Sequence, residues 1–270
     1  MTKDYAITQT EVFKNLDGLS YDIDVDRNIG WLILDRPPYN VISYRARFQI
    51  NAIIEAMSDD NDVRAIVIRG SNGVFSSGGD VKSFSKIERD GMSNLAWNIA
   101  APTRSPKPVI CAMEKYAMGV GFELAMSSDI RVATKNTLLA LPEVSIGQIP
   151  GSGGSHRVAR IVGLSRAADL MYLGRRISAL EAMEWGLLNE VVEDAEDLQG
   201  TIYKMVETLN NQSPLALKTM KRVLSTTYET GLQVGIELEG QAYEKLRDSE
   251  DYKEGIAAFA EKRKAYYKGC

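Results

Sequence analysis

The sequence predicts an α/β fold in which short strands and helices alternate to about residue 193, followed by a helical C-terminal region. Short apolar runs of strand length alternate with segments of helical period through the first two thirds of the chain, whereas only helical periodicity follows Asp194. The 270 residues, 44% hydrophobic and 25% charged, are enough for one large core. We therefore expect an N-terminal extension at residues 1–19, a core at 20–193 and a helical region at 194–270.

The first elements follow from the apolar pattern and its interruptions. Residues 21–26 and 29–34 are predicted strands, and the polar residues between them are typical of a hairpin turn. Ser43 is a predicted N-cap for a helix that runs to about Asp59, because a serine oxygen can accept a hydrogen bond from a free amide of the first turn. Residues 65–68 form the next predicted strand, which is buried.

The remaining elements continue this alternation and then leave it. Further strands are predicted at residues 109–113, 130–133 and 138–140, and further helices at 121–127 and from 154 to about 162. Four helices are predicted in the C-terminal region, at residues 198–209, 214–224, 232–246 and 252–267. A polar, extended tail of this kind often packs on a second copy of the chain, and a free-standing helical lobe is the alternative.

Composition and charge argue against several classes of protein. The formal net charge is −4 and the isoelectric point about 5.3, which disfavours general nucleic-acid binding but allows a local basic pocket for a phosphorylated ligand. No apolar stretch is long enough to cross a bilayer, and the first residues lack the apolar core of a signal peptide. We therefore expect neither a nucleic acid nor a membrane as a partner.

Cysteine and histidine usage indicates a reducing compartment and argues against metal chemistry. The two cysteines lack disulfide spacing; Cys111 lies in an apolar run and is expected to be buried and inert, and the terminal Cys270 to be exposed. His156 is the single histidine, so we expect no metal site built on histidine or cysteine, and a structural or surface role for His156. These features predict a cytoplasmic protein.

Two glutamates in glycine-rich settings are the strongest candidates for chemistry. Glu123 follows Gly119 and Gly121 at the start of a predicted helix, whose free amides favour negative charge. Its apolar neighbours indicate a functional role or a buried partner, unless the helix phase turns the carboxylate to solvent. Glu143 follows Pro142. Two carboxyl groups that converge on one site can divide acid and base work on a water molecule.

Two further segments rich in small residues accompany the glutamates. The sequence Ser76-Ser77-Gly78-Gly79-Asp80 lets the backbone approach a ligand, so an amide in it can bind a developing oxyanion; a capped strand-to-helix turn is the alternative. Residues 146–154 interleave glycines with Ile146 and Ile149, which predicts a closely packed loop. A Walker phosphate loop is disfavoured there because its Lys-Ser/Thr pair is absent.

Together these segments resemble the crotonase (enoyl-CoA hydratase/isomerase) family over nearly the whole chain after the first 19 residues. The resemblance rests on motifs that occur in the family's order. They are Leu34-Asp35-Arg36-Pro37 with Asn40, Phe75-Ser76-Ser77-Gly78-Gly79-Asp80-Val81-Lys82, Glu123-Leu124-Ala125-Met126-Ser127-Ser128-Asp129-Ile130, Leu141-Pro142-Glu143 through Gly154, residues 163–190, and residues 255–264. Each motif alone is moderately specific, and their common order is highly specific.

The resemblance implies a fold, an assembly and a reaction. It implies a crotonase-like ββα superhelix, a spiral of strand-strand-helix turns whose C-terminal helices mediate homotrimers, often paired as dimers of trimers. It implies an acyl-CoA substrate, with coenzyme A as part of the substrate and no cofactor. The expected reaction is the reversible hydration of a 2-enoyl-CoA to a 3-hydroxyacyl-CoA, because hydratases of the family use both glutamates and isomerases typically keep only the equivalent of Glu143.

The resemblance also implies roles for individual residues. Glu123 and Glu143 would hold the attacking water, and the backbone N–H groups of Gly79 and Val120 would bind the thioester oxygen as an enolate forms. Which glutamate carries the proton stays open. The other residues expected to contact the substrate or its coenzyme A are Arg36, Ser77, Gly78, Asp80, Val81, Lys82, Trp97, Gly119, Gly151 and Lys262, with Arg263 and Lys264 as further cations for the phosphates. Solvated surface charge is the alternative for each cation.

Several positions depart from the family pattern and bear on the acyl group. Glu114 and Lys115 are charged where the family usually has uncharged residues. Val120 stands where glycine is common, so its Cβ is expected to crowd the space beside the thioester, and Gly79 stands where alanine is common and is expected to open space. Trp97, with Met92 and Leu95, falls in a predicted helix, where packing is the default role and lining an acyl pocket the alternative. The acyl group stays open between linear, branched, cyclic and aromatic-derived forms.

Three alternatives to hydration remain from the sequence. A double-bond isomerase or a CoA-thioester hydrolase could use the same scaffold. A non-catalytic paralogue that binds acyl-CoA or RNA is the alternative from a different class. The presence of both glutamates disfavours loss of catalysis, and the acidic isoelectric point disfavours RNA.

Overall fold

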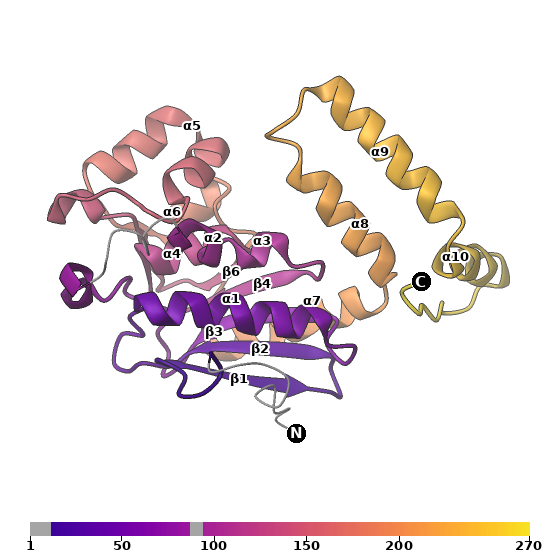
Figure 1. Cartoon of the computed structure of the whole chain (residues 1–270), viewed down its shortest axis with the longest axis horizontal. Helices are drawn as coiled ribbons and strands as arrows, with labels where there is room; N and C mark the ends of the chain where they lie inside the picture. Colours follow the sequence, from indigo (N-terminus) through magenta and orange to yellow (C-terminus); the bar gives the residue numbers. More distant parts are fainter. Residues whose placement is uncertain (1–11, 87–93) are drawn as a thin grey trace.

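A computed structural model describes residues 12–86 and 94–270, and its centre is a six-stranded sheet (Figure 1). The strand order is β1-β2-β3-β4-β6-β9. The first two strands form the predicted antiparallel hairpin, and every later pair is parallel. The strands are β1 (Leu19–Asp24), β2 (Ile29–Leu34), β3 (Ala65–Gly70), β4 (Val109–Met113), β6 (Ile130–Thr134) and β9 (Glu190–Val192). Residues 1–11 of the expected N-terminal extension lie outside the described residues.

A second, smaller sheet receives one strand from successive turns of the chain. It comprises β5 (Tyr116–Met118), β7 (Leu138–Ala140) and β8 (Ile177–Ser178). A parallel bridge between Ser76 and Ala117 extends this sheet toward earlier parts of the chain, and a parallel bridge joins Ile42 to Gly79. Consecutive strands β4 and β5, and then β6 and β7, thus enter different sheets before each following helix. This arrangement confirms the predicted α/β fold with strand-strand-helix turns.

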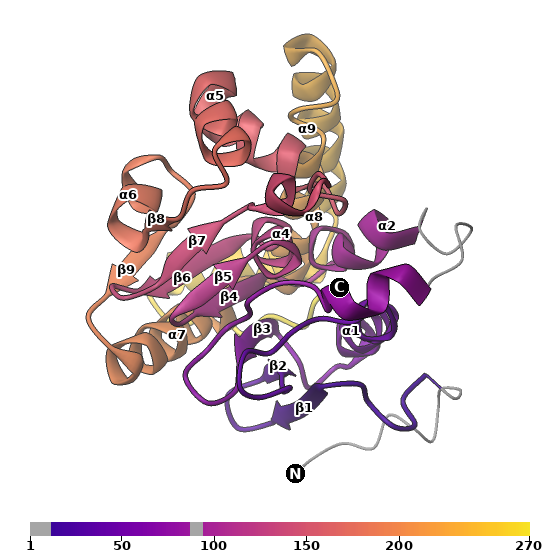
Figure 2. The ribbon, with the colours of Figure 1, turned by 90° about the vertical axis from the view of Figure 1, so that its left-hand side faces the viewer.

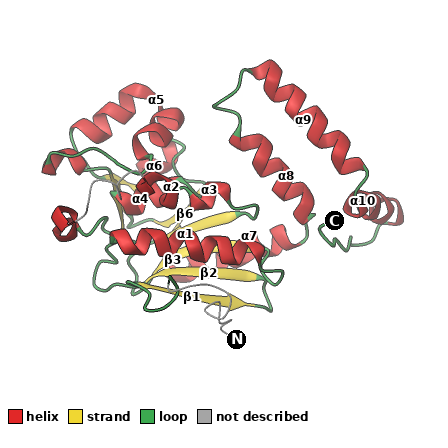
Figure 3. Cartoon of the chain, viewed as in Figure 1, coloured by secondary structure: helices red, strands yellow, loops and turns green. Residues whose placement is uncertain are grey.

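Ten helices occur in the part of the chain that the structure describes, and several match the predicted ranges closely (Figure 3). The Ser43 side chain accepts a hydrogen bond from Ala46 N–H at 3.0 Å, which confirms it as the cap of the first helix. The helices are α1 (Tyr44–Asp59), α2 (Leu95–Ile99), α3 (Ala101–Arg104), α4 (Val120–Met126), α5 (Gly154–Tyr172), α6 (Ala179–Glu184), α7 (Ala195–Asn210), α8 (Pro214–Ser225), α9 (Leu232–Arg247) and α10 (Glu250–Glu261). Two 3₁₀ helices cover Val81–Lys86 and Glu143–Ile146.

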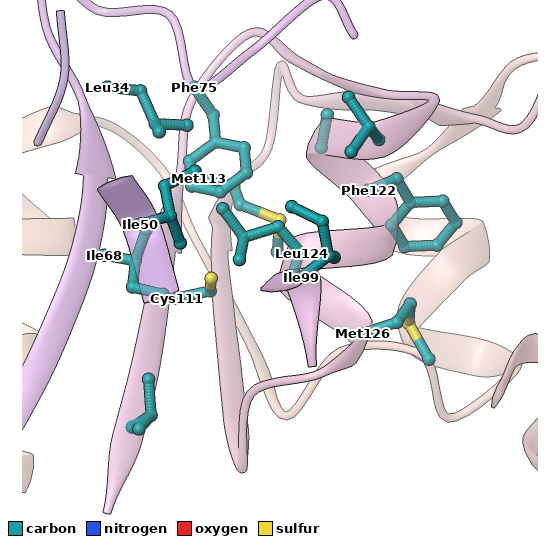
Figure 4. Close-up of a cluster of buried hydrophobic side chains, with 14 of the residues drawn as sticks. Leu34, Ile50, Ile68, Phe75, Ile99, Cys111, Met113, Phe122, Leu124 and Met126 are labelled. Carbon is teal, nitrogen blue, oxygen red and sulfur yellow. The ribbon is translucent and has the colours of Figure 1, made fainter. Parts of the chain in front are cut away.

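The two faces of the larger sheet are covered by different helices, with α1 on one face and α7 on the other (Figure 2). Side chains alternate between the faces as strand geometry requires: Ile66 and Ile68 join the cluster of α1, whereas Val67 joins that of α7. Figure 4 shows the larger cluster, in which Cys111 lies among apolar side chains. Burial raises the pKa of the Cys111 thiol to about 12, so the expectation of a buried, inert cysteine is confirmed.

Only helices follow β9, which confirms the helical C-terminal region, but the last helix is shorter than predicted. It ends at Glu261 because Lys262 adopts a left-handed conformation with φ 53°. The Arg263 side chain then turns back to pair with Glu254. The prediction that helical structure continues to residue 267 is therefore wrong. No helix among the described residues is both long and apolar enough to cross a membrane.

The loop between Glu143 and α5 is also less enclosed than predicted. Ile146 is 50% exposed and Ile149 72% exposed in the chain, so the interleaved isoleucines do not pack the loop into its own core. The loop becomes buried at Pro150 and again at Ser152, where it approaches α4. The expectation of a closely packed loop is thus correct only for its last residues.

Candidate active site

The segment that contains Gly79 lies directly beside the segment that contains Val120. The N–H of Ser76 donates to the Tyr116 carbonyl at 2.7 Å, and the N–H of Met118 donates to the Ser76 carbonyl at 3.0 Å. Gly78 has φ 111°, and a Cβ added there would lie 3.1 Å from the Met118 carbonyl oxygen. The close approach and the left-handed backbone explain why glycine is required at position 78.

The backbone amides of Gly79 and Val120 have no acceptor within residues 12–86 and 94–270. The N–H of Ile42 donates to the Gly78 carbonyl, and the N–H of Asp80 donates to the Ile42 carbonyl. The pairing with Ile42 therefore uses the residues on both sides of Gly79 and leaves the Gly79 amide without an acceptor in it. Val120 is the first residue of α4 and follows Gly119. Free amides on two adjacent segments are the arrangement that an oxyanion hole needs.

Glu123 is buried and firmly positioned by backbone donors. Its side chain is 2% exposed, and its Oε1 accepts hydrogen bonds from the N–H of Ser152 at 2.7 Å and of Gly154 at 2.9 Å. This confirms the buried partner that its apolar surroundings indicated and rules out the alternative of a solvent-facing side chain. A Cβ added at Gly154 would lie 2.8 Å from Cγ of Glu123, so the start of α5 also confines the side chain sterically.

Glu143 reaches the same region from the first residue of its 3₁₀ helix. A Cβ added at Gly119 would lie 3.0 Å from Oε1 of Glu143, so the Glu143 carboxyl lies beside Gly119, which directly precedes Val120. Its Oε2 is buried and has no partner among the described residues. Burial raises the pKa of Glu143 to about 7; the charge of Glu123 also raises it, and a backbone hydrogen bond and Arg47 partly offset the rise.

Arg47 is a member of this site that the sequence reasoning missed. It lies on α1, is 5% exposed and donates from Nη1 to Ser152 Oγ at 2.9 Å. Desolvation by burial lowers its pKa, and the charges of Glu123, Tyr44 and Glu143 act in the opposite direction. The sequence did contain a signal for Arg47, because it lies three residues before Ile50 on the apolar face of a predicted helix. A charged residue is rarely buried on such a face without a partner or a function.

Gly79 does not leave open space, contrary to the expectation. A Cβ at Gly79 would lie 2.7 Å from Cζ of Phe84, so the phenyl ring of the 3₁₀ helix fills the region that an alanine methyl would occupy. That ring also packs edge-on against Tyr44, with centroids 5.5 Å apart. The side chain of Val120 is 3% exposed and belongs to the hydrophobic core cluster.

The cations expected near coenzyme A differ in their ion pairs, their exposure and their place in the fold. Arg36 forms an ion pair with Asp17 and approaches Asp80 at 3.8 Å, so its charge is already compensated. Lys82 and Val81 are exposed at the start of the 3₁₀ helix. Lys262 follows α10, which Figure 1 shows far from α4, so a single chain does not bring Lys262 to the glutamates. Arg263 pairs with Glu254, and Lys264 is exposed.

The remaining predicted contact residues differ in their exposure and in their contacts. The N–H of Ser77 donates to the Tyr39 carbonyl, and Gly151 is exposed immediately before Ser152. Trp97 is 60% exposed on α2, with the Arg104 guanidinium 3.7 Å from its ring centroid, and Met92 lies outside the described residues. His156 is exposed. Within residues 12–86 and 94–270, no group of three or more His, Cys, Asp or Glu residues is placed to hold a metal ion.

Comparison with known proteins identifies the family to which the chain belongs. The family model described as enoyl-CoA hydratase/isomerase matches residues 24–270. A protein of Arabidopsis thaliana described as probable enoyl-CoA hydratase 2, mitochondrial, is 36% identical over 247 residues, which cover 87% of this chain and 80% of that protein. Carnitinyl-CoA dehydratase of Proteus mirabilis is 33% identical over 246 residues, covering 88% and 94% of the two chains.

A solved structure extends the agreement to three dimensions. The crystal structure of an enoyl-CoA hydratase subunit from Geobacillus kaustophilus superposes with a TM-score of 0.88 at 32% identity, covering 95% of this chain and all of that one. Fold, motif order and sequence identity thus lead to one family. The chain is an enoyl-CoA hydratase-like member of the enoyl-CoA hydratase/isomerase, or crotonase, family.

Proposed function

We propose that this chain catalyses the reversible hydration of a 2-enoyl-CoA to a 3-hydroxyacyl-CoA. The observation that supports the proposal most strongly is the pairing of two unlike carboxyl groups beside two free amides. Glu123 is held by two backbone donors, whereas burial raises the pKa of Glu143 to about 7. Hydration needs one carboxylate to accept a proton and one carboxyl group to donate one, and this difference supplies both.

In the first step, Glu123 acts as the base. It accepts a proton from water while the water oxygen forms a bond to the β-carbon of the enoyl group. The electron pair of the double bond moves toward the thioester carbonyl, and the negative charge that develops on the carbonyl oxygen is bound by the N–H groups of Gly79 and Val120. Donors fixed in advance stabilise such charge without reorganisation.

In the second step, Glu143 acts as the acid. It delivers its proton to the α-carbon as the enolate collapses back to the thioester. Glu123 then carries the proton taken from water, and transfer to Glu143 or to solvent restores the starting state. The buried, unpartnered Oε2 of Glu143 is suited to this exchange because no protein group within the described residues occupies it. The sequence alone left this assignment of acid and base open.

Three cations are candidates for binding the phosphates of the coenzyme A portion. Exposed Lys82 follows Gly79 closely in the chain, which supports it as a cation for the phosphates. Arg36 would have to exchange its carboxylate partners, and Lys262 could reach a site only from a second copy of the chain, given its place after α10. A cytoplasmic location stays a prediction.

Replacing each glutamate by glutamine tests the proposal. Glutamine at position 123 keeps an oxygen that can accept from Ser152 and Gly154, so the change removes the base without removing the anchor. We expect kcat for hydration to fall by about 10²–10⁴-fold in Glu123→Gln and in Glu143→Gln. Glu207→Gln, an exposed glutamate on α7, is the matched control and should leave hydration unchanged.

The outcomes separate the competing reactions. Double-bond isomerisation that survives in Glu123→Gln but not in Glu143→Gln would support an isomerase that uses Glu143 alone. Release of free coenzyme A thiol from the wild-type enzyme would indicate a thioester hydrolase. Tight binding of acyl-CoA esters without turnover across linear, branched and cyclic substrates would indicate a non-catalytic paralogue. Full hydration by Glu123→Gln would contradict the proposed mechanism.

A further inference from the structure

We propose that Arg47 binds a carboxylate carried by the acyl group, so that the substrate is an enoyl-CoA with an anionic acyl chain. This inference rests on the proposed hydration and specifies the chemical class of its substrate. It depends on an arginine that is buried in the site, has a donor without a partner among the described residues and lies beside the groups that act on the acyl chain.

The guanidinium of Arg47 is buried without a full set of acceptors. Its side chain is 5% exposed, and Nη1 donates to Ser152 Oγ at 2.9 Å. Nε is buried and has no partner among the described residues, and the carboxylates of Glu123 and Glu143 act on the guanidinium electrostatically. Burying a charged group with an unused donor is costly, so a ligand anion that accepts from this donor would explain its presence.

The position of Arg47 identifies which part of the substrate it can reach. A Cβ added at Gly79 would lie 3.7 Å from Nη2, so the guanidinium is next to an expected donor for the thioester oxygen. Ser152, its hydrogen-bond acceptor, also donates its N–H to Glu123. The phosphates of coenzyme A require a solvent-facing cation, whereas this buried one adjoins the reacting atoms. A group bound here therefore belongs to the acyl chain.

The charges around the site favour an anion over a neutral acyl chain. Arg47 and Arg157 both interact electrostatically with Glu123. When Glu143 carries the proton that the acid step requires, these two cations face one carboxylate and leave one positive charge uncompensated. Arg157 already donates to the Ser152 carbonyl at 2.9 Å, whereas the Arg47 guanidinium retains an unused donor. Arg47 is thus the better-placed ligand for a second carboxylate.

A purely supporting role for Arg47 explains less of the structure. Glu123 is anchored by two backbone N–H groups and does not need a guanidinium to hold it. Hydrophobic side chains of similar size would fill the position on α1 without the cost of desolvating a charge. The Tyr44 ring, whose centroid is 5.1 Å from the guanidinium carbon, provides a stacking surface for the guanidinium.

The experiment compares matched pairs of substrates on the wild-type enzyme. Enoyl-CoA esters with acyl chains of increasing length are prepared with a terminal carboxylate, and each is paired with its neutral methyl ester and its alkyl analogue of equal length. A charged, bidentate contact should raise kcat/KM for the best carboxylated substrate by about 10-fold to 100-fold over its neutral partners. Because this comparison needs no variant, it cannot be obscured by misfolding.

Two variants then assign the preference to Arg47. Arg47→Met removes the charge at similar length and should bring the ratio of kcat/KM between carboxylated and neutral partners close to one, whatever its effect on the absolute rates. Arg47→Lys should keep part of the preference, because a lysine supplies charge but not the planar fork. Arg45→Met is the matched control, since Arg45 is exposed two residues earlier on the same helix, and it should leave the preference unchanged.

Each outcome decides the inference. Equal kcat/KM for carboxylated and neutral substrates in the wild-type enzyme would overturn it while leaving hydration in place. If the methyl esters and the carboxylates both have higher kcat/KM than the alkyl analogues, the site prefers a polar acyl group, and the inference of an anionic substrate is overturned. Equal loss on all substrates in Arg47→Met, with an altered pH profile, would make Arg47 a positioning residue for the glutamates. Absence of hydration with every substrate would overturn the proposed function itself.

Discussion

Glu123 and Glu143 differ in the groups that surround their carboxyls, and the roles proposed for them rest on this difference. Glu123 has two backbone donors on one oxygen, whereas one oxygen of Glu143 is buried with no partner among the described residues. Desolvation disfavours the charged form of a carboxyl group, so burial is the largest cause of the raised pKa of Glu143. The proposed assignment of base and acid to two identical side chains therefore rests on their different environments.

The pKa of Glu143 predicts the basic limb of the pH profile. The proposed mechanism needs Glu143 protonated, so kcat/KM should fall about tenfold per pH unit above about 7. The pKa of Glu143 is about 7 in the folded state, above the ordinary value of 4.5, so the folded state binds this proton more tightly than the unfolded state does. The contribution of protonated Glu143 to the free energy of unfolding should therefore decline as the pH rises from about 4.5 to 7. Rate profiles of the wild-type enzyme and Glu143→Gln test this expectation. A wild-type profile that stays flat to pH 9 would contradict the assignment.

At the scale of elements, the 3₁₀ helix Val81–Lys86 supports the first oxyanion segment through Phe84. The ring occupies the space beside Gly79, so the backbone there is confined by a side chain from the next element. Motif comparison interpreted glycine at this position as open space, because sequence cannot show which side chain fills it. The Tyr44 ring, on α1, packs edge-on against the Phe84 ring.

A substitution at Gly79 tests this support. Gly79→Ala places a methyl group 2.7 Å from Cζ of Phe84, which should displace the amide and lower kcat/KM by about 10-fold to 100-fold. Adding Phe84→Leu, which removes the clashing atom, should restore much of the activity, and the double-mutant cycle measures that coupling. Gly200→Ala is the control, since no atom lies within 4 Å of its added Cβ. Additive losses in the double variant would show that Phe84 does not constrain Gly79.

Sequence patterns between neighbouring residues predicted the ends of some helices correctly. They failed for features that depend on contacts between residues far apart in the chain. The Ser43 cap and the helix end at Asp59 depend on neighbouring residues, and the structure reproduces both. The end of α10 depends on Arg263 returning to Glu254, which periodicity cannot detect. Arg47 was missed for the same reason, because its partner Ser152 lies 105 residues further along the chain. The glutamates were found because glycine-rich surroundings and apolar neighbours mark them locally.

At the scale of the whole molecule, α8 and α9 lie side by side and project from the sheet-containing part of the chain (Figure 1). No residue of these two helices, which the structure describes throughout, is buried. Large apolar side chains are exposed along them and on α10: Met220, Leu224, Leu232, Val234, Ile236, Tyr243, Ile256 and Phe259. Extended apolar surface of this kind is typical of an interface.

We propose that these helices join three copies of the chain, alone or as a pair of trimers. The mass in solution should then be three or six times 29.9 kDa, measured by sedimentation or light scattering. Ile236→Asp, on exposed α9, should shift the population to smaller species, because a buried carboxylate in an apolar interface is costly. Gln241→Asp adds the same charge at an exposed polar position of that helix. A monomer at micromolar concentration would contradict the proposed assembly.

The mass of the product formed in water labelled with heavy oxygen tests the central claim most directly. A 2-enoyl-CoA is incubated with the wild-type enzyme and with Glu123→Gln, and the acyl-CoA products are analysed by mass spectrometry. The account predicts that the wild-type product gains one water whose labelled oxygen is bound to carbon, and that Glu123→Gln forms this product at least about a hundredfold more slowly. A wild-type product of unchanged mass, or free coenzyme A with a labelled carboxylic acid, would contradict it.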